Sequence, residues 1–535
     1  MGETLAVARR PGERHGLLAM ISIAALMGAL CLVFDPRWET NDDVAMSMVA
    51  HGYGLATYSS PLLVFSNVMW GAIARSIPAI HGVLGYSIAS MAVLFVSGWA
   101  MLYFLLRLGA GYLLSMLCLA LLLPRPILFP QFTLNAGLLT AAAIIGWRAY
   151  VRCGRGGMLV AASLLAFLGY LVRSREFFLV LGVALPLLPW DGFRRLRKMQ
   201  ASALVLGLAI ASAAALDRCS YRGAEWKQFL ALHRARALYT DFRAGEVLKE
   251  HPEIMTRHGF SENDVELIEQ WFFVDPQLAD PQPLYAMLAE IGPRPMRAAR
   301  IKTGGAALGT LIAPVLLPLL VPAILLFTFA PRWSVALAWM SCLAAVFAVG
   351  AMGRLGVVRV YVPPMCLLVV APLVVGNVKQ TLRRLLAAST LIVALAWNAF
   401  LLIPEASASK KTMAQIRRDL GELPADSIVC WGGNFPFESA FPVLSRDPLP
   451  RAIRIYPLGV LTHAPFSVAT AEVKVGRGMI DRLRSPEGVP IVATKHRMDR
   501  LGLYCQERLK GRLRTEVVHQ TPSLTIRKAW CGGTE

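Results

Sequence analysis

Charged residues are scarce in this sequence, at 16% of its 535 residues. A soluble domain carries about 25% charged residues, so this scarcity excludes a soluble globular protein. Hydrophobic residues make up 56% of the chain, and its mean hydropathy is +0.52. The composition therefore predicts an α-helical polytopic membrane protein.

Motifs for metals, nucleotides and repeats are also missing. The nine cysteines contain no CxxC pair and no zinc spacing, and the chain has no P-loop, no Gly-rich phosphate fingerprint and no internal repeat. These absences argue against a zinc site, a nucleotide site and a repeat protein. Four cysteines, Cys219, Cys430, Cys505 and Cys531, lie in polar segments. One disulfide could form among them in an oxidising compartment, and free thiols are the equal alternative.

Basic residues outnumber acidic ones, and the formal net charge is +20. They occur as short clusters between apolar runs rather than as the continuous basic surface typical of nucleic-acid binding. Because basic residues are enriched on the cytoplasmic side of membrane proteins, the clusters indicate topology, and we expect no nucleic-acid partner. The clusters are Arg9-Arg10, Arg148/Arg152/Arg155, Arg194-Arg195/Arg197-Lys198 and Lys379/Arg383-Arg384.

The apolar runs predict about eleven membrane-spanning helices with the N-terminus in the cytoplasm. No small-residue cleavage site follows the first run, so we interpret it as an anchor rather than a signal peptide. The patchy segment 61–80 is predicted to be an interfacial amphipathic helix, because a span there would put the next basic clusters outside. The runs lie near 16–34, 83–106, 112–124, 127–147, 158–172, 177–190, 201–216, 305–330, 333–351, 357–376 and 384–403.

This topology predicts a transmembrane domain over 1–403 and a small extracytoplasmic α/β domain over 404–535. Two loops, 35–82 and 217–303, also lie outside. Ser261 and Asp264 have the spacing of a capping box at the start of a helix in the second loop. In these segments the pattern predicts helices at 224–239, 261–272, 413–420 and 498–509, and strands at 427–431, 489–493 and 524–527.

The segment Glu39-Thr40-Asn41-Asp42-Asp43 follows the first apolar run and contains the strongest candidates for chemistry. Adjacent carboxylates at a membrane surface are costly to desolvate, so a loop that keeps them there is expected to use them. They could remove a proton from a hydroxyl as a general base, or bind a metal through oxygen. The structural alternative is that Thr40, Asn41 or Asp42 caps a helix over 44–51.

Arginines predicted on the outer side are the second set of candidates. Arg173 and Arg175, with Glu176, lie between two apolar runs, and Arg359 lies at the outer end of a later run. Basic residues are normally scarce outside, and arginine binds phosphate bidentately, so a lipid phosphate is a natural ligand. Snorkelling to headgroups is the structural alternative. Arg236 lies among aromatic residues of the loop 217–303, where sugar or headgroup contact and helix packing explain it equally well.

A carboxylate motif in the first external loop, many spans, a long external loop and an external α/β tail together resemble the GT-C superfamily. These integral-membrane glycosyltransferases use polyprenyl-phosphate sugars, and they include bacterial lipid A aminoarabinose and protein mannosyl transferases. The resemblance covers most of the chain, and its sharp motif is 39–43. The sequence is also similar to uncharacterised bacterial membrane proteins that share the segments 40–43, 131–133 and 261–264.

The resemblance implies an enzyme of the bacterial inner membrane that transfers a sugar, with inversion, from a lipid-linked donor to an acceptor hydroxyl outside. The acceptor would be a glycan, a lipid or a protein. Asp42 or Asp43 would be the catalytic base, and Arg173, Arg175 or Arg359 would bind the lipid phosphate. A divalent cation, if one is used, would bind to the two aspartates. The predicted substrate-binding set is completed by Glu39, Asn41, Glu176 and Arg236.

Three other functions fit parts of the same pattern. A transporter or flippase of a lipid-linked envelope substrate would place charges at the centres of its spans, where this sequence has almost none. A non-catalytic envelope scaffold or sensor would use the tail and leave the aspartates structural. A polymer ligase or polymerase would share the donor chemistry.

Overall fold

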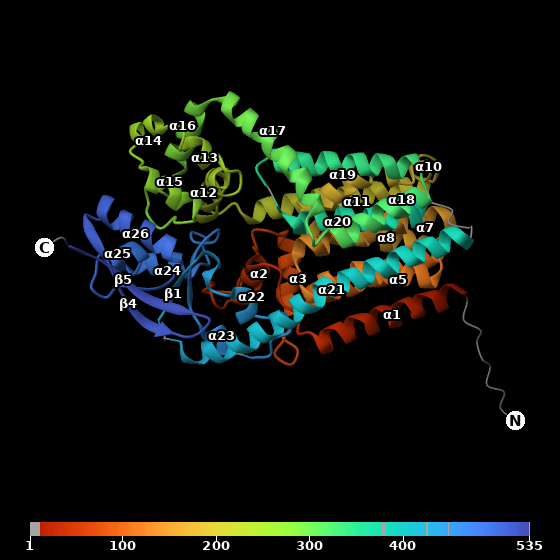
Figure 1. The fold of residues 1–535 in the computed structure, drawn as a ribbon, viewed down its shortest axis with the longest axis horizontal. Helices are drawn as coiled ribbons and strands as arrows, with labels where there is room; N and C mark the ends of the chain where they lie inside the picture. Colours follow the sequence, from red (N-terminus) through yellow and green to blue (C-terminus); the bar gives the residue numbers. More distant parts are fainter. Residues whose placement is uncertain (1–10, 355, 376–380, 424–425, 448, 534–535) are drawn as a thin grey trace.

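The computed structural model describes residues 11–354, 356–375, 381–423, 426–447 and 449–533. The basic pair Arg9-Arg10 and Lys379 lie outside these ranges. The molecule has two parts along its long axis, an elongated helical bundle and a unit of short helices and a sheet at one end (Figure 1). We call this second part, residues 224–291 and 426–533, the head unit.

The bundle contains seven helices that are long and apolar enough to cross a membrane, among the residues that the structure describes. They are α1 (Pro11–Val33), α4 (Gly85–Arg107), α7 (Phe132–Cys153), α11 (Arg197–Ser220), α19 (Trp333–Ala351), α20 (Val358–Val375) and α21 (Thr381–Asp419). An eighth span results if two segments are counted as one broken helix. The first is Arg300–Ile312, from α17 (Pro293–Gly309) and η2 (Thr310–Ile312), the second is α18 (Leu317–Phe329), and they are bent by 86° at the break between them. The chain is therefore a multi-pass membrane protein.

The prediction of about eleven spans also counted apolar runs that form shorter helices. Two of these helices have 11 residues and the third has 17. At 1.5 Å per residue, 11 residues extend about 17 Å, roughly half of the hydrocarbon thickness. The three are α5 (Tyr112–Leu122), α8 (Gly156–Val172) and α9 (Ser174–Ala184). The remaining bundle elements are α2 (Asn41–His51), α3 (Val68–Ser76), α6 (Pro124–Leu128), η1 (Leu185–Leu187) and α10 (Trp190–Arg195).

The segment 61–80 forms only one short helix, α3, with nine residues. Asn67 caps it by accepting a hydrogen bond from the backbone N–H of Met69. About 14 Å of helix cannot cross the roughly 30 Å of a hydrocarbon core. The prediction that 61–80 is not a span is confirmed.

Helix α7 lies at the centre of the bundle and is buried along almost its whole length. It packs against α4, α8 and α20. Gly137 makes the last of these contacts possible, because a Cβ at this position would lie 2.2 Å from the Cβ of Pro363 in α20. A separate hydrogen bond, from the backbone N–H of Phe132 to Asp43, joins the N-terminus of α7 to the first turn of α2.

Two of the basic clusters found in the sequence lie at one end of the bundle. Helix α10, which carries Arg194 and Arg195, and the first turn of α21, which carries Arg383 and Arg384, lie at the end opposite the head unit (Figure 1). The carboxylates of α2 lie at the end nearest the head unit (Figure 1). This separation matches the orientation expected from the basic clusters.

The head unit contains a five-stranded mixed sheet with the order β2-β1-β3-β5-β4. β1 pairs in parallel with β2 and β3, while β5 pairs antiparallel with β3 and β4. The strands are β1 (Ile428–Trp431), β2 (Ile455–Leu458), β3 (Val489–Val492), β4 (Gly511–Gln520) and β5 (Thr525–Gly533). The helices beside them are η3 (Leu420–Glu422), η4 (Gly432–Asn434), α22 (Phe437–Ala440), α23 (Leu449–Ala452), α24 (Val468–Lys474), α25 (Met479–Leu483) and α26 (Lys495–Glu507).

The long loop 217–303 and the sheet share one hydrophobic core. Phe272 from the loop lies 5.1 Å from Trp431 in β1 and 5.0 Å from Tyr504 in α26, measured between ring centroids. The loop helices are α12 (Ala224–Thr240), α13 (Ala244–Leu248), α14 (Pro252–Arg257), α15 (Glu262–Glu269) and α16 (Pro281–Ile291). Residue 403, the predicted domain boundary, lies inside α21, so the chain enters the head unit as a continuous helix.

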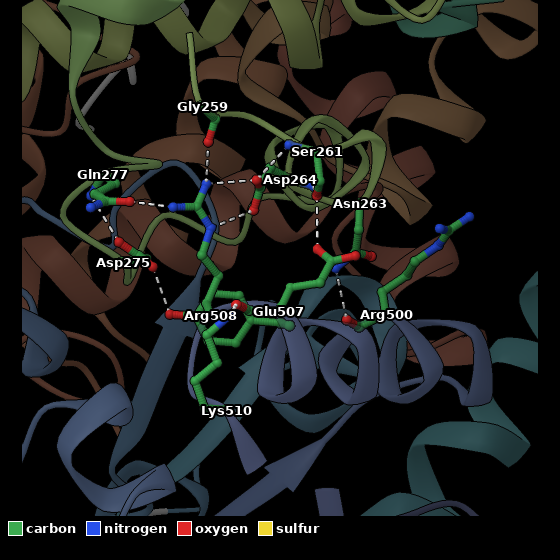
Figure 2. Close-up of polar contacts among 11 residues, drawn as sticks. Gly259, Ser261, Asn263, Asp264, Asp275, Gln277, Arg500, Glu507, Arg508 and Lys510 are labelled. Carbon is green, nitrogen blue, oxygen red and sulfur yellow. Dashed lines mark hydrogen bonds and ion pairs between the residues drawn. The ribbon is translucent and has the colours of Figure 1, made fainter. Parts of the chain in front are cut away.

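A buried ion pair fastens the loop helices to the sheet region (Figure 2). The guanidinium of Arg508, at the end of α26, donates to both carboxylate oxygens of Asp264 at 2.6 and 3.2 Å. It also donates to the backbone oxygen of Gly259 and to Gln277 (Figure 2). Asp264 in turn accepts from the backbone N–H of Ser261, which completes the predicted capping box of α15. One carboxylate therefore caps a helix and joins two distant segments.

Most elements predicted for the head unit are present. The helices at 224–239 and 498–509 correspond to α12 and α26, and the strands at 427–431 and 489–493 correspond to β1 and β3. β5 extends the predicted strand 524–527 because it pairs with β4, which was not predicted. The open question about a disulfide is settled for one pair, since Cys505 is bonded to Cys531.

Candidate functional site

Helix α2 places the predicted carboxylates between the bundle and the head unit (Figure 1). It packs against α3 and α4 of the bundle and against α22 of the head unit. Thr40 is the N-cap residue, and its side chain makes no capping hydrogen bond. Asp42 and Asp43 lie in the first turn, where their charge suits the helix dipole. Capping alone does not account for them, because other groups hold both side chains.

Asp43 is fully buried. Its Oδ1 accepts a hydrogen bond from the hydroxyl of Tyr86 at 2.9 Å and another from the backbone N–H of Phe132, the first residue of α7, at 3.1 Å. Burial is the largest influence on this carboxyl, and it raises the pKa of Asp43 well above the ordinary range. Its Oδ1 already has two donors and the residue has no exposed surface, so Asp43 is suited to hold α2 in place.

Asp42 has a different environment one residue earlier. Its side chain is 26% exposed, and its Oδ2 lies 3.4 Å from Nη2 of Arg359, in the first turn of α20. The two side chains form an ion pair that joins α2 to α20. Asp42 is therefore an accessible carboxylate with a cation next to it.

Three further arginines surround this pair. Arg173, between α8 and α9, donates to the backbone oxygen of Phe65 at 2.6 Å, and its guanidinium lies 5.0 Å from the ring centroid of Phe132. Burial lowers the pKa of Arg173 to about 10, with Arg175, Asp42 and Arg354 also acting on it, so it stays charged at neutral pH. Arg354 forms an ion pair with Asp241 at 3.2 Å. We call Arg173, Arg175, Arg354 and Arg359 the arginine cluster.

The structure thus brings four of the predicted site residues into one electrostatic neighbourhood: Asp42, Arg173, Arg175 and Arg359. Glu39 is directed elsewhere, since it pairs with Arg125 at 2.9 Å.

The other predicted members lie around this centre. Arg125, the partner of Glu39, also pairs with Glu405 in α21 at 2.9 Å, so Glu39 ties the first loop to that helix. Asn41 is exposed at the start of α2, and Glu176 is buried under α9 with its Oε1 unpaired among the described contacts. Arg236 lies in α12 beside a separate pocket. Substrate-binding roles for these residues stay predictions.

Two residues near the site were missed from the sequence. Tyr86, the partner of Asp43, follows Gly85 in an apolar run, and no local signal marks its hydroxyl as a partner of a distant carboxylate. Glu438 in α22 is half-buried near Arg37 and the backbone of Asn41, and burial is the main cause that raises its pKa. Both depend on contacts between segments far apart in the chain.

A pocket lies between α2 and the segment 441–451 of the head unit. Its open volume is about 310 Å³. Trp38, Tyr53 and Phe441 provide aromatic walls, and Ser47 and Arg451 provide polar groups. Ser47 lies one helical turn after Asp43, so the pocket adjoins the buried carboxyl.

Metal ligands do not gather into an obvious centre. Within the described part of the chain, no group of three or more His, Cys, Asp or Glu residues is placed to hold a metal ion. A cation held by Asp42 together with a substrate phosphate would not need such a group. A divalent cation at Asp42 and Asp43 stays a prediction.

No protein-family model and no curated protein matches this chain. Solved structures similar to it include two of ArnT from Cupriavidus metallidurans. The structure bound to undecaprenyl phosphate is 12% identical, with a TM-score of 0.39, and the apo structure is 12% identical, with a TM-score of 0.41. Each alignment covers 97% of this chain and 99% of the other chain. The superposition is loose, and we draw no conclusion about function from it.

Proposed function

We propose that this protein is a GT-C-type glycosyltransferase of a bacterial inner membrane. It would transfer a sugar from a polyprenyl-phosphate donor to an acceptor hydroxyl on the outer face. The observation that carries this proposal is the pairing of the accessible carboxylate of Asp42 with the arginine cluster, at the end of the bundle that faces the head unit.

The chemistry needs the two kinds of group that meet here. Asp42 accepts the proton of the acceptor hydroxyl while the hydroxyl oxygen forms a bond to the anomeric carbon. The bond from that carbon to the phosphate oxygen breaks, and its electron pair leaves with the polyprenyl phosphate. Arginines stabilise the negative charge that develops on the phosphate. Attack from the side opposite the leaving group gives inversion.

Asp43 has a positioning role in this proposal. Its carboxyl joins the first turn of α2 to Tyr86 in α4 and to the first backbone N–H of α7. These bonds fix the orientation of the first turn of α2, and with it the direction in which the side chain of Asp42 points. Asp42 is therefore the base and Asp43 supports it.

The orientation in the membrane follows from charge and cysteine chemistry. Two basic turns, in α10 and at the start of α21, lie at the end of the bundle away from the head unit (Figure 1), which supports a cytoplasmic location for that end. The Cys505–Cys531 disulfide in the head unit is typical of an oxidising compartment. A lipid-linked sugar in the outer leaflet would present its phosphate at this level.

Donor discharge tests the proposal. The purified protein would be reconstituted in liposomes with a panel of polyprenyl-phosphate sugars and an envelope extract as the acceptor source, and released polyprenyl phosphate would be measured. We expect wild-type turnover with at least one donor, and a loss of about 10²–10⁴-fold in Asp42→Asn, the range for a general base.

Asp35→Asn is the matched control. Asp35 is an aspartate of the same loop whose side chain is 63% exposed, 3.9 Å from Lys410, so its loss should leave turnover unchanged. If wild type discharged no donor, while Asp42→Asn stayed folded and complemented a deletion strain, the enzyme proposal would be wrong. The scaffold or transporter alternatives would then be favoured.

A further inference from the structure

A second pocket lies inside the head unit, between α12 and the segment 459–463. Its empty space of about 200 Å³ includes open solvent, and the enclosed part is about 10 Å³, room for about one oxygen atom of a ligand and not for a whole lipid. Phe229, Leu232 and Phe273 form apolar walls. Arg236, His233 and His463 supply the polar groups we use below. The donor chemistry proposed above does not use this pocket.

Arg236 is the unusual member of the lining. Only 3% of this residue is exposed, and its Nε has no hydrogen-bond partner. Its guanidinium lies 4.5 Å from the ring centroid of Trp271 and donates to the hydroxyl of Thr240 at 3.2 Å. Within the described chain no carboxylate forms an ion pair with it. Asp241 acts on the charge of Arg236 but is itself paired with Arg354. A buried cation without an anion of its own is costly, so an anionic ligand would complete this site.

His233 adds a hydrogen-bond donor. Its Nδ1 lies 2.6 Å from Nη2 of Arg236, and since guanidinium only donates, Nδ1 accepts this bond. Burial and the neighbouring charges of Arg236, Arg175 and Arg173 lower the pKa of His233 to about 3, so the ring is neutral. A neutral ring that accepts at Nδ1 carries its proton on Nε2. His233 therefore offers an N–H donor beside the charge of Arg236.

The opposite wall comes from the sheet region. The Nε2 of His463 bonds to the backbone oxygen of Phe273, so this nitrogen carries the proton and Nδ1 is left as an acceptor. The pocket thus combines one cation, one N–H donor and one acceptor. That set fits an anionic oxygen group with a hydroxyl next to it. The charges of Arg173 and Arg175 act on His233, so the pocket adjoins the arginine cluster.

We propose that the pocket lined by Arg236, His233 and His463 binds an anionic oxygen group of the acceptor, so that the enzyme selects acidic acceptors. The inference rests on the proposed transfer reaction, because only a second substrate needs a second anion site. Phosphate and carboxylate share this chemistry, and the geometry of an arginine fork suits both.

Calorimetric titration of the full-length protein in nanodiscs tests this. Inorganic phosphate and glucuronate serve as separate probes, glucose is the neutral comparison, and saturating polyprenyl phosphate is present to occupy the arginine cluster. We expect wild type to bind phosphate or glucuronate but not glucose. Arg236→Gln should weaken that binding about tenfold or more, the usual scale for a charge-assisted hydrogen bond. Preference for one probe would tell phosphorylated from carboxylated acceptors.

Lys227→Gln is the matched control, since Lys227 is an exposed cation of the same helix and its loss should leave binding within about twofold of wild type. His233→Ala is a second variant in case Arg236→Gln does not fold, and it should weaken binding about threefold or more by removing one donor. Wild-type binding of neither anion, or equal binding in wild type and the folded variants, would overturn the proposal. Binding needs no donor sugar, so failure of the transfer reaction would be seen separately.

Discussion

Asp42 and Asp43 are neighbours in the chain, yet the structure gives them opposite properties. The sequence marks both as candidates because two carboxylates follow the first apolar run. Which of them is accessible depends on Tyr86 and on the first backbone N–H of α7, which are 43 and 89 residues from Asp43. Contacts between residues so far apart cannot be predicted from the local sequence pattern. The type of residue could therefore be predicted, while the division of roles could not.

Tyr86→Phe should lower the stability of the protein and slow donor discharge. The change removes the hydroxyl that donates to the buried carboxyl of Asp43 and leaves one backbone donor. An unsatisfied buried polar group costs about 1–3 kcal/mol, so we expect a lower melting temperature together with weaker donor discharge. Tyr285→Phe is the control, because Tyr285 is 44% exposed and should tolerate the change. An unchanged melting temperature in Tyr86→Phe would contradict the supporting role of Asp43.

His233 should make stability depend on pH. Its folded-state pKa is about 3, against an ordinary value of 6.5, because burial and then the nearby arginines disfavour the charged ring. The unfolded chain binds this proton more readily, so the stabilisation is complete above pH 6.5 and is lost as the pH falls towards 3. At about pH 5 the free energy of unfolding should be lower than at neutral pH by up to about 2 kcal/mol.

Melting temperatures measured between neutral and mildly acidic pH check this expectation. His233→Gln should flatten part of the decline, whereas His251→Gln, at a histidine with 36% side-chain exposure, should follow wild type. If His233→Gln declined as steeply as wild type, the ring would not be buried in its neutral form.

At the scale of elements, sequence patterns worked best where an element is specified locally. Helix α15 has its capping box, α26 its amphipathic pattern, and β1 a short apolar run that ends at glycines. β4 was missed because most of its residues are exposed, so no buried face marks it, and its pairing with β5 defines it. The joint between the loop 217–303 and the sheet could not be predicted either, because contacts between distant segments define it.

Asp264→Asn should loosen that joint. The substitution removes the charge that pairs with Arg508 and places an amide donor against donors of Arg508 or Ser261 (Figure 2). Breaking a buried pair costs about 3–5 kcal/mol, and since the side chain of Arg508 is 20% exposed we expect roughly 2–4 kcal/mol. Limited proteolysis of the loop 217–303 should become faster. Glu290→Gln breaks an exposed pair with Arg257 and should change little.

At the scale of the whole molecule, composition and charge placement predicted the class of protein and its polarity. The number of spans was harder to predict, because hydropathy reports apolar residues and does not show where a helix ends. The run at 112–124 ends in α5 after 11 residues, and a separate short helix, α6, begins at Pro124, whose ring cannot continue a regular helix. α21 shows the reverse, since it continues well past its apolar segment into the head unit.

Cysteine labelling in intact cells should report the predicted orientation. With a membrane-impermeant maleimide, Cys219, which is exposed at the end of α11 nearest the head unit, should react directly. Cys505 and Cys531 should react only after a reductant opens their disulfide. Cys153, at the opposite end of the bundle, should stay unlabelled until the cells are permeabilised. Labelling of Cys153 but not Cys219 would reverse the orientation and remove Asp42 from the outer face.

Rescue of Asp42→Ala by azide tests the central claim most directly. Azide is a nucleophile that has no proton to lose, so it needs no base. If Asp42 is the base and the arginine cluster binds the leaving phosphate, azide should restore discharge of the donor in Asp42→Ala. It should give a glycosyl azide of inverted configuration and one equivalent of polyprenyl phosphate, and it should have little effect on wild type. If wild type turned over the donor but azide produced no glycosyl azide in the folded variant, Asp42 would not be the base.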